Sequence, residues 1–200
     1  MKPATLIVML KQPRPGRVKT RLGRDIGMTT AAWWFRHQTR ALLRRVQDPR
    51  WQVVLAVSPD AEGLQSRIWP AHLPRLAQGR GDLGDRMARV LRKVGHGPAC
   101  VIGADIPQID TNHIAQAFRA LGGHDAVFGP APDGGYWLVG LKHPKRQSHK
   151  LFANVRWSTE HALADSKASL PEHRIADIAT LRDVDTLHDL PMTRPEARAT

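Results

Sequence analysis

The chain has few cysteines, few acidic residues and no long apolar run. Its single cysteine, Cys100, excludes an intramolecular disulfide, and its apolar neighbours favour an unreactive thiol in the core. No apolar run approaches the roughly 20 residues that span a bilayer. Lys11, Arg14 and Arg17 follow the short N-terminal apolar stretch in place of a signal-peptide cleavage site. These absences predict a cytoplasmic protein without a membrane span.

Acidic residues are outnumbered, with 18 Asp and Glu against 30 Lys and Arg and a net charge of +12. This balance favours anionic partners such as nucleic acid, phosphorylated small molecules or an acidic membrane surface. The arginines are spread along the chain, and neither a zinc-finger spacing nor an RNP-like motif is present. None of the ten histidines lies in an HExxH motif or beside a cysteine pair, which argues against zinc. We therefore expect a nucleotide or sugar phosphate as the partner, and no nucleic acid.

The apolar pattern predicts strands that alternate with helices. Continuous apolar runs at residues 5–10, 51–57 and 99–102 are typical of strands buried on both faces. Helical spacing predicts helices from Thr29 or Thr30 to about Val46, over 83–94, and from Asp110 or Thr111 to Gly123. Residues 61–78 are interpreted as a short helix and a poor strand. This alternation predicts an α/β fold with a mainly parallel sheet covered on both faces.

The pattern changes after residue 125. Expected strands at residues 125–129 and 136–141 follow one another without a helix between them, which predicts a small antiparallel part. Ser158 and Thr159 are expected to cap a further helix, and a last strand is expected near residues 173–178. No linker or internal repeat is found. We expect a single domain over residues 1–200, with a core over about 4–190 and a flexible tail over 191–200.

Residues 11–22 form a cationic loop after the first strand. Two prolines and Gly16 interrupt the apolar pattern, and five cationic side chains lie among them. Gly16, Lys19, Thr20 and Arg21 could surround phosphates, because glycine allows close approach and the cations supply charge-assisted donors. Val18 stands directly before Lys19, where a Walker A loop needs glycine. A solvated basic loop is the alternative interpretation.

Two acidic motifs are further candidates for the same edge of the sheet. Asp105 follows a buried strand, and in open α/β sheets ligands bind at the carboxyl ends of strands. Asp133 precedes two glycines and an aromatic pair, in the motif DGGYW. Each has a structural alternative, since Asp105 could cap a turn and Asp-Gly is a common hairpin signal. In the segment 182–190, Asp185 precedes Thr186 and could equally cap a helix.

Taken together, the motifs resemble a known family. The order KxPxPGxVKTRL, GDLGxRM, GADxP, FGPAxDGGYWLVGL, LFxxVxWST and DVDTxxDL, over about residues 5–190, is similar to that of bacterial glycosyltransferase-like proteins. That family has the three-layer GT-A fold of nucleotide-diphospho-sugar transferases and is similar to molybdenum-cofactor and phospholactate guanylyltransferases. One departure is VMLK at the end of the first strand, where relatives have an aromatic residue before the lysine. This departure bears on base selectivity and not on phosphate binding.

The resemblance implies roles for particular residues. The nucleotide and its phosphates are expected against Leu10, Lys11, Gly16, Arg17, Lys19, Thr20 and Arg21, with Asp82 toward the base or ribose. Asp105, with Asp185 completing the shell, is expected to hold Mg²⁺ or Mn²⁺, because both ions prefer oxygen ligands. The acceptor is expected to lie near Gly134, Gly135 and Tyr136. Lys19 and Asp133 are the expected catalytic residues.

Three functions remain open from the sequence. A glycosyltransferase would pass a sugar from a nucleotide sugar to a small-molecule acceptor. The metal and Lys19 or Arg21 would stabilise the departing nucleoside diphosphate, and a carboxylate such as Asp133 would activate the acceptor hydroxyl. A guanylyl- or cytidylyltransferase would instead release pyrophosphate from a nucleoside triphosphate. A nucleotide- or nucleic-acid-binding protein without catalysis is the third. The first is favoured by the resemblance alone, because a fold does not fix a reaction.

Overall fold

The computed structural model describes residues 3–184. Its strands are β1 (Ala4–Lys11), β2 (Trp51–Ser58), β3 (Arg75–Ala77), β4 (Ala99–Ile102), β5 (Ala126–Pro130), β6 (Tyr136–Leu141) and β7 (Ile175–Asp177). Its α-helices are α1 (Thr20–Ile26), α2 (Met28–Arg45), α3 (Asp60–Gln65), α4 (Leu83–Lys93), α5 (Thr111–Gly123) and α6 (Ala162–Ala168), and a 3₁₀ turn, η1, spans Pro144–Arg146. No helix among these residues is long and apolar enough to cross a membrane.

The strands form one seven-stranded sheet in the order β3-β2-β1-β4-β6-β5-β7. Every neighbouring pair is parallel except the two pairs made by β6, which runs antiparallel to both β4 and β5. The predicted mainly parallel sheet with an antiparallel part after residue 125 is therefore confirmed.

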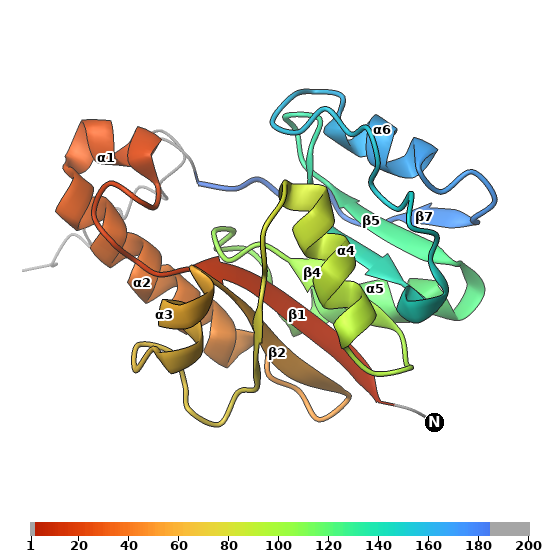
Figure 1. Ribbon diagram of the computed structural model, residues 1–200, viewed down its shortest axis with the longest axis horizontal. Coiled ribbons are helices and arrows are strands. Elements are labelled where there is room, and N and C mark those ends of the chain that lie inside the picture. Colours follow the sequence, from red (N-terminus) through yellow and green to blue (C-terminus); the bar gives the residue numbers. More distant parts are fainter. Residues whose placement is uncertain (1–2, 185–200) are drawn as a thin grey trace, which may run out of the picture.

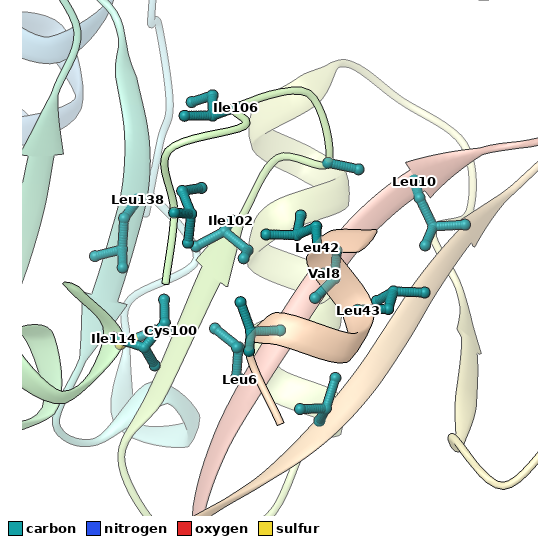
Figure 2. Close-up of a cluster of buried hydrophobic side chains, with 14 of the residues drawn as sticks. Leu6, Val8, Leu10, Leu42, Leu43, Cys100, Ile102, Ile106, Ile114 and Leu138 are labelled. Carbon is teal, nitrogen blue, oxygen red and sulfur yellow. The ribbon is translucent and has the colours of Figure 1, made fainter. Parts of the chain in front are cut away.

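Helices cover both faces of this sheet (Figure 1). Successive side chains of a strand point to opposite faces, so Leu6, Val8 and Leu10 of β1 join the cluster under α2 and α5. Ile7 joins the cluster under α4 and α6 instead. Figure 2 shows the first cluster, in which Cys100 packs among aliphatic side chains. Cys100 is fully buried, and this burial raises the pKa of its thiol, as expected of an unreactive core cysteine.

The strand directions bring several chain segments to one edge of the sheet. The parallel strands β1, β2, β4, β5 and β7 all end at this edge, which we call the carboxyl edge. Because β6 runs the other way, it begins at the carboxyl edge, and the turn over 131–135 between β5 and β6 also lies there. The cationic loop, the loop after β4 that carries Asp105, and the turn over residues 131–135, which we call the DGG turn, therefore share one edge, although they are far apart in sequence.

Three expected boundaries were wrong. The loop after β1 ends at Lys19, because residues 20–22 already form the first turn of α1. Helix α2 begins at Met28 after Gly27, so neither Thr29 nor Thr30 caps it. Helix α6 begins at Ala162, beyond Ser158 and Thr159. Thr29 and Thr30 lie within the first turn of α2, whereas Thr159 is engaged in the turn before α6.

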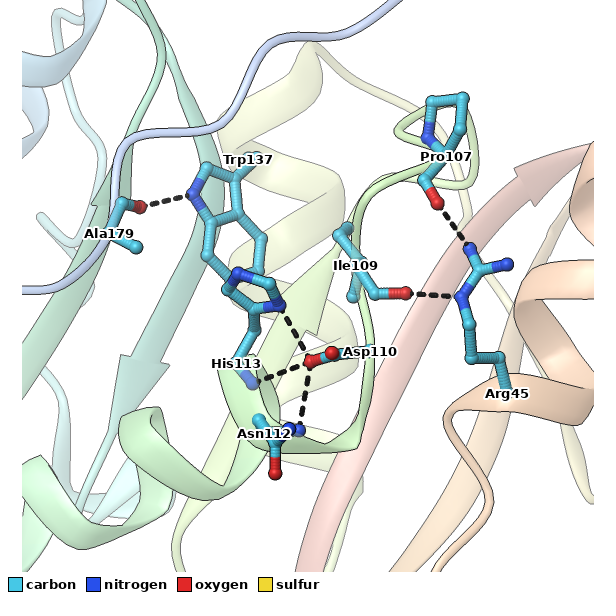
Figure 3. Close-up of polar contacts among 8 residues, drawn as sticks. All are labelled: Arg45, Pro107, Ile109, Asp110, Asn112, His113, Trp137 and Ala179. Carbon is cyan, nitrogen blue, oxygen red and sulfur yellow. Dashed lines mark hydrogen bonds and ion pairs between the residues drawn. The ribbon is translucent and has the colours of Figure 1, made fainter.

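The loop that carries Asp105 is held at two points (Figure 3). Arg45 of α2 donates hydrogen bonds from Nε to the carbonyl of Ile109 (2.6 Å) and from a terminal nitrogen to that of Pro107 (2.7 Å). At the end of the loop, the Asp110 carboxylate accepts from the backbone N–H groups of Asn112 (2.9 Å) and His113 (3.0 Å) as the N-cap of α5. The backbone on both sides of this cap is therefore fixed.

Replacing Asp110 tests this anchoring. Asp110→Ala should cost about 1 kcal/mol of unfolding free energy at pH 7, because two backbone donors lose their acceptor. Asp110→Asn, which preserves an N-cap, should cost only a few tenths. Partial burial opposes ionisation of Asp110, but hydrogen bonds from His113 and Asn112 lower its pKa overall. The stabilisation is therefore present above the unfolded-state pKa and is lost as the pH falls through the folded-state value. In urea unfolding, the difference in unfolding free energy between the wild type and Asp110→Ala should shrink below about pH 4. A difference that stays constant with pH would contradict this account.

Candidate active site at the carboxyl edge

Lys19 and Asp105 form an ion pair at the carboxyl edge. The Lys19 Nζ lies 2.8 Å from Asp105 Oδ2, and the Lys19 side chain is only 6% exposed. Lys19 occupies the N-cap position of α1 with left-handed backbone angles, φ 46° and ψ 48°. A non-glycine residue in this conformation is uncommon and often marks a functional site. The expected meeting of the cationic loop and the acidic strand end is confirmed as geometry, while their chemical roles remain predictions.

The cationic loop is fixed from within. Gln12 is 7% exposed, its N–H donates to Ser58 O (2.9 Å), and its side-chain amide donates to Glu62 O (3.1 Å). Val18, directly before Lys19, is buried in the core. Gly16 has a φ of +71°, so it serves the turn of the loop. The loop is thus tied to the β2–α3 connection at one end and to the core at the other.

A second carboxylate reaches the same ammonium group. After β7, the chain runs along the carboxyl edge, where Leu181 N–H donates to Pro130 O (3.2 Å) and Val184 N–H to Asp105 O (3.3 Å). This path brings Asp183 Oδ2 to 3.9 Å from Lys19 Nζ. The carboxylates of Asp105 and Asp183 therefore both lie within 4 Å of the Lys19 ammonium group. Asp185, the second predicted metal ligand, lies outside the described residues.

A cavity of about 420 Å³ opens beside the cationic loop, and we call it the cationic cavity. Its charged lining consists of Lys11, Arg17, Lys19, Arg21 and Asp105. Leu10 and Thr20, also predicted to bind the nucleotide, line it too. Gly16 and Asp82 do not. Asp82 is the N-cap of α4, and its Oδ1 accepts from Asp85 N–H (2.8 Å), so its predicted contact with a base or ribose stays a prediction.

A neighbouring cavity of about 290 Å³ lies toward β6, and we call it the aromatic cavity. Tyr136, Trp137 and Trp157 contribute its aromatic lining. The two cavities share Asp105 and Gly103 from the loop after β4, together with Met9 and Leu83. The ion pair therefore stands where the two cavities meet.

The DGG turn forms one wall of the aromatic cavity, to which Asp133 and Gly135 contribute but Gly134 does not. The Asp133 carboxylate accepts from Gly135 N–H (3.0 Å) and is exposed. Gly134 has a φ of +82°, and a Cβ there would collide with the backbone of Glu160. Its carbonyl accepts from Leu163 N–H (2.9 Å). Gly134 therefore joins the turn to the start of α6 and acts as a positioning residue.

Tyr136 lines the aromatic cavity with its hydroxyl group already engaged. Ser166 Oγ donates to the Tyr136 hydroxyl oxygen (3.1 Å), and the ring packs edge-on against Phe128 with centroids 5.1 Å apart. Burial raises the pKa of Tyr136, so the phenol keeps its proton at neutral pH. Tyr136 can contact a ligand but cannot act as a base there.

Residues that the sequence reasoning missed also line the site. Gln78 is 3% exposed in the cationic cavity, where its Nε2 donates to Ala56 O (2.8 Å) and Leu10 O (3.2 Å). Trp157, Ser158 and Thr159 line the aromatic cavity. The signal for Gln78 was its place between a strand and a glycine-rich turn. The signal for residues 157–159 was the WST motif, which was interpreted only as a helix start.

The fold places the chain among α/β proteins of the GT-A nucleotide-diphospho-sugar transferase type. More narrowly, the chain belongs to DUF2064, a family described as an uncharacterized protein conserved in bacteria, whose model matches residues 41–159. No curated protein matches the chain.

Solved structures resemble the whole described fold. A Desulfovibrio desulfuricans protein assigned as a nucleotide-diphospho-sugar transferase is 27% identical, with a TM-score of 0.84 over 94% of this chain and 85% of that one. The 4-diphosphocytidyl-2C-methyl-D-erythritol synthase of Anaerococcus prevotii is 10% identical, with a TM-score of 0.61 over 94% and 92%. A Mycobacterium tuberculosis protein in complex with manganese is 15% identical, with a TM-score of 0.55 over 94% and 95%.

Substituting Gly134 tests how the turn is positioned. Gly134→Ala should lower the unfolding free energy by about 2–3 kcal/mol, because the new Cβ meets Glu160 and the residue must keep a positive φ. Gly122→Ala is the matched control, since a Cβ at Gly122 meets nothing within 4 Å. That control should be neutral or slightly stabilising in α5. If Gly134→Ala and Gly122→Ala changed the unfolding free energy equally in thermal and urea unfolding, the positioning role of Gly134 would be contradicted.

Proposed function

We propose that the protein is a metal-dependent transferase that uses a nucleotide-activated donor, and that it transfers a sugar from a nucleotide sugar. The observation that carries the proposal is the Lys19–Asp105 pair at the boundary between the cationic and aromatic cavities. If the diphosphate of the donor bound in the cationic cavity, the group to be transferred would lie beside the aromatic cavity, where an acceptor can bind. Two substrates held at one boundary are what group transfer requires.

The cationic cavity suits phosphates. Lys11, Arg17, Lys19 and Arg21 supply charge-assisted donors, and Asp105 is the one carboxylate among the described residues of the lining. The loop is held by Gln12 and Val18 without a ligand, so little ordering is needed on binding. Preorganised cations of this kind stabilise negative charge as it develops on a leaving diphosphate.

The donor set at Lys19 fits Mg²⁺ or Mn²⁺. Two carboxylates, Asp105 and Asp183, already face a single cationic group within 4 Å (3.9 Å for Asp183), and both are oxygen donors. Residues 3–184 contain no group of three or more metal-binding side chains. Two carboxylates suffice for Mg²⁺, which takes its other ligands from water and substrate phosphates. When bound, the ion would neutralise charge on the diphosphate, with Asp185 as a further predicted ligand.

In the proposed reaction, an acceptor hydroxyl oxygen forms a bond to the anomeric carbon of the sugar. The bond from that carbon to the diphosphate oxygen breaks, and the electron pair leaves with the nucleoside diphosphate. The hydroxyl proton passes to the Asp133 carboxylate, which is exposed at the aromatic cavity and accepts a hydrogen bond from Gly135 N–H. Lys19 and the arginines hold the departing phosphates.

Nucleotidyl transfer is a second candidate, favoured by one observation. Four cationic side chains line the cationic cavity, which also suits the larger charge of a nucleoside triphosphate. In that reaction, a substrate oxygen attacks the α-phosphorus and pyrophosphate leaves. A panel of nucleotide sugars and nucleoside triphosphates with Mg²⁺ or Mn²⁺ separates the two reactions, because one releases nucleoside diphosphate and the other pyrophosphate. Binding without either product would support the non-catalytic alternative.

Replacing Asp105 tests the metal site. Asp105→Ala should reduce turnover by about 10²-fold or more, which corresponds to roughly 3 kcal/mol of transition-state stabilisation. It should also abolish the gain in nucleoside diphosphate affinity that Mn²⁺ gives the wild type in calorimetric titrations. Asp177→Ala removes a carboxylate paired with Lys167 outside both cavities, and it should change neither quantity. An Asp105→Ala protein with normal turnover and metal response would refute the site.

A further inference from the structure

The aromatic cavity has a second wall to which no role has been assigned, made by Trp157, Ser158 and Thr159. We call these three residues the WST segment. The segment faces the same cavity as the DGG turn, and the Gly134–Leu163 hydrogen bond (2.9 Å) joins the two walls behind it. We propose that the WST segment binds the acceptor, and that the acceptor is a small, uncharged, hydroxylated molecule. This inference rests on the proposed function, because it names the acceptor class for that reaction.

The charge of the lining selects against an anionic acceptor. Among the described residues that line the aromatic cavity, the charged side chains are Asp105, Asp133 and Asp183, and no Lys, Arg or His is present. Lys19 contacts two of these carboxylates but lines the cationic cavity. In a chain with a net charge of +12, this separation confines phosphate recognition to the cationic cavity. A phosphorylated acceptor would face carboxylates and find no cation in the lining.

Trp157 supplies a rigid aromatic surface. Its ring packs against Phe152 (centroids 6.2 Å apart) and Tyr136 (6.4 Å), and a Cβ on Gly84 of α4 would lie 2.8 Å from its Cζ2. Its indole Nε1 is buried and has no hydrogen-bond partner among residues 3–184. An unsatisfied buried donor is unusual, because it loses its water without compensation. An apolar ligand face can pack on such a ring at little entropic cost.

Ser158 supplies a hydroxyl group. Its φ of 60° is left-handed, a conformation that is unfavourable for serine and that clusters at binding sites. Thr159 Oγ1 is engaged within its own turn by Arg156 O (2.7 Å) and His161 N–H (3.2 Å). Ser158 is exposed and lines the aromatic cavity. It can both donate to and accept from a ligand hydroxyl.

The size of the cavity sets the size of the ligand. About 290 Å³ lies just below the range for small-molecule sites, roughly 300–1,000 Å³. The apolar lining, with Met87 and Val139 among its members, suits a molecule that has one apolar face. A glycoside or a small polyol has the size and the uncharged, partly apolar surface that this cavity suits. A phosphate ester of either molecule carries a negative charge that the lining does not suit.

The test uses the indole N–H of Trp157 as a reporter that needs no turnover. The chain has six tryptophans, and Trp157→Phe assigns the Trp157 signal in a ¹⁵N-correlated NMR spectrum of the full chain with Mg²⁺. The probes are methyl glucoside, glucose 6-phosphate, glucosamine and glycerol. We expect methyl glucoside or glycerol to shift the Trp157 signal, and glucose 6-phosphate to bind at least 10-fold more weakly. The exposed Trp33, which lines neither cavity, is the internal control and should not respond.

Ser158→Gly is the matched variant, because glycine keeps the positive φ at no steric cost and removes the hydroxyl group together with its Cβ. It should weaken the uncharged probe by about 5-fold and leave nucleoside diphosphate affinity unchanged. Four results would overturn the inference: equal or tighter binding of glucose 6-phosphate, a 10-fold preference for glucosamine, a silent Trp157 signal with every probe, or unaltered probe affinity in Ser158→Gly. Probe binding without any transfer would count against the proposed function alone. Nucleoside diphosphate release with a silent Trp157 would count against this inference alone.

Discussion

The ion pair between Lys19 and Asp105 is the interaction on which the arrangement of the site depends. It joins the first loop of the chain to the loop after β4, and it stands where the cationic and aromatic cavities meet. A nearly buried ammonium group needs a partner, because an unpaired charge there would cost several kcal/mol. Asp105 supplies that partner and Asp183 shares the charge. The pair therefore holds two distant segments together even without a ligand.

The reversed direction of β6 explains how the second cavity arises. A uniformly parallel sheet would put a crossover connection between β5 and the next strand. The antiparallel pairing instead allows the short 131–135 turn, which lies at the same edge as Asp105. The chain beyond β7 then follows this edge and delivers Asp183. One change of strand direction thus sets an acidic and aromatic surface beside a cationic one.

Much of this could be predicted from the sequence because local patterns specify it. Buried strands have continuous apolar runs, and Asp105 could be placed because it follows such a run directly. Asp183 and the WST segment could not be placed, because tertiary contacts with Pro130, Asp105 and Gly84 position them. The start of α1 was also missed, since its first turn is cationic and its N-cap, Lys19, lacks a capping side chain. Local sequence propensity does not predict the position of a segment that long-range packing determines.

The two cavities share residues from the N-terminal half of the chain, but only the aromatic cavity also draws on described residues beyond residue 130, and this difference has an evolutionary consequence. Among the described residues, those that line the cationic cavity fall in the range from Met9 to Asp105, whereas the DGG turn and the WST segment lie after residue 130. Substitutions in the C-terminal half can remodel the aromatic cavity while the cationic loop stays intact. If the proposed function holds, members of a lineage built on this plan can diverge in what they modify while sharing the same activated donor.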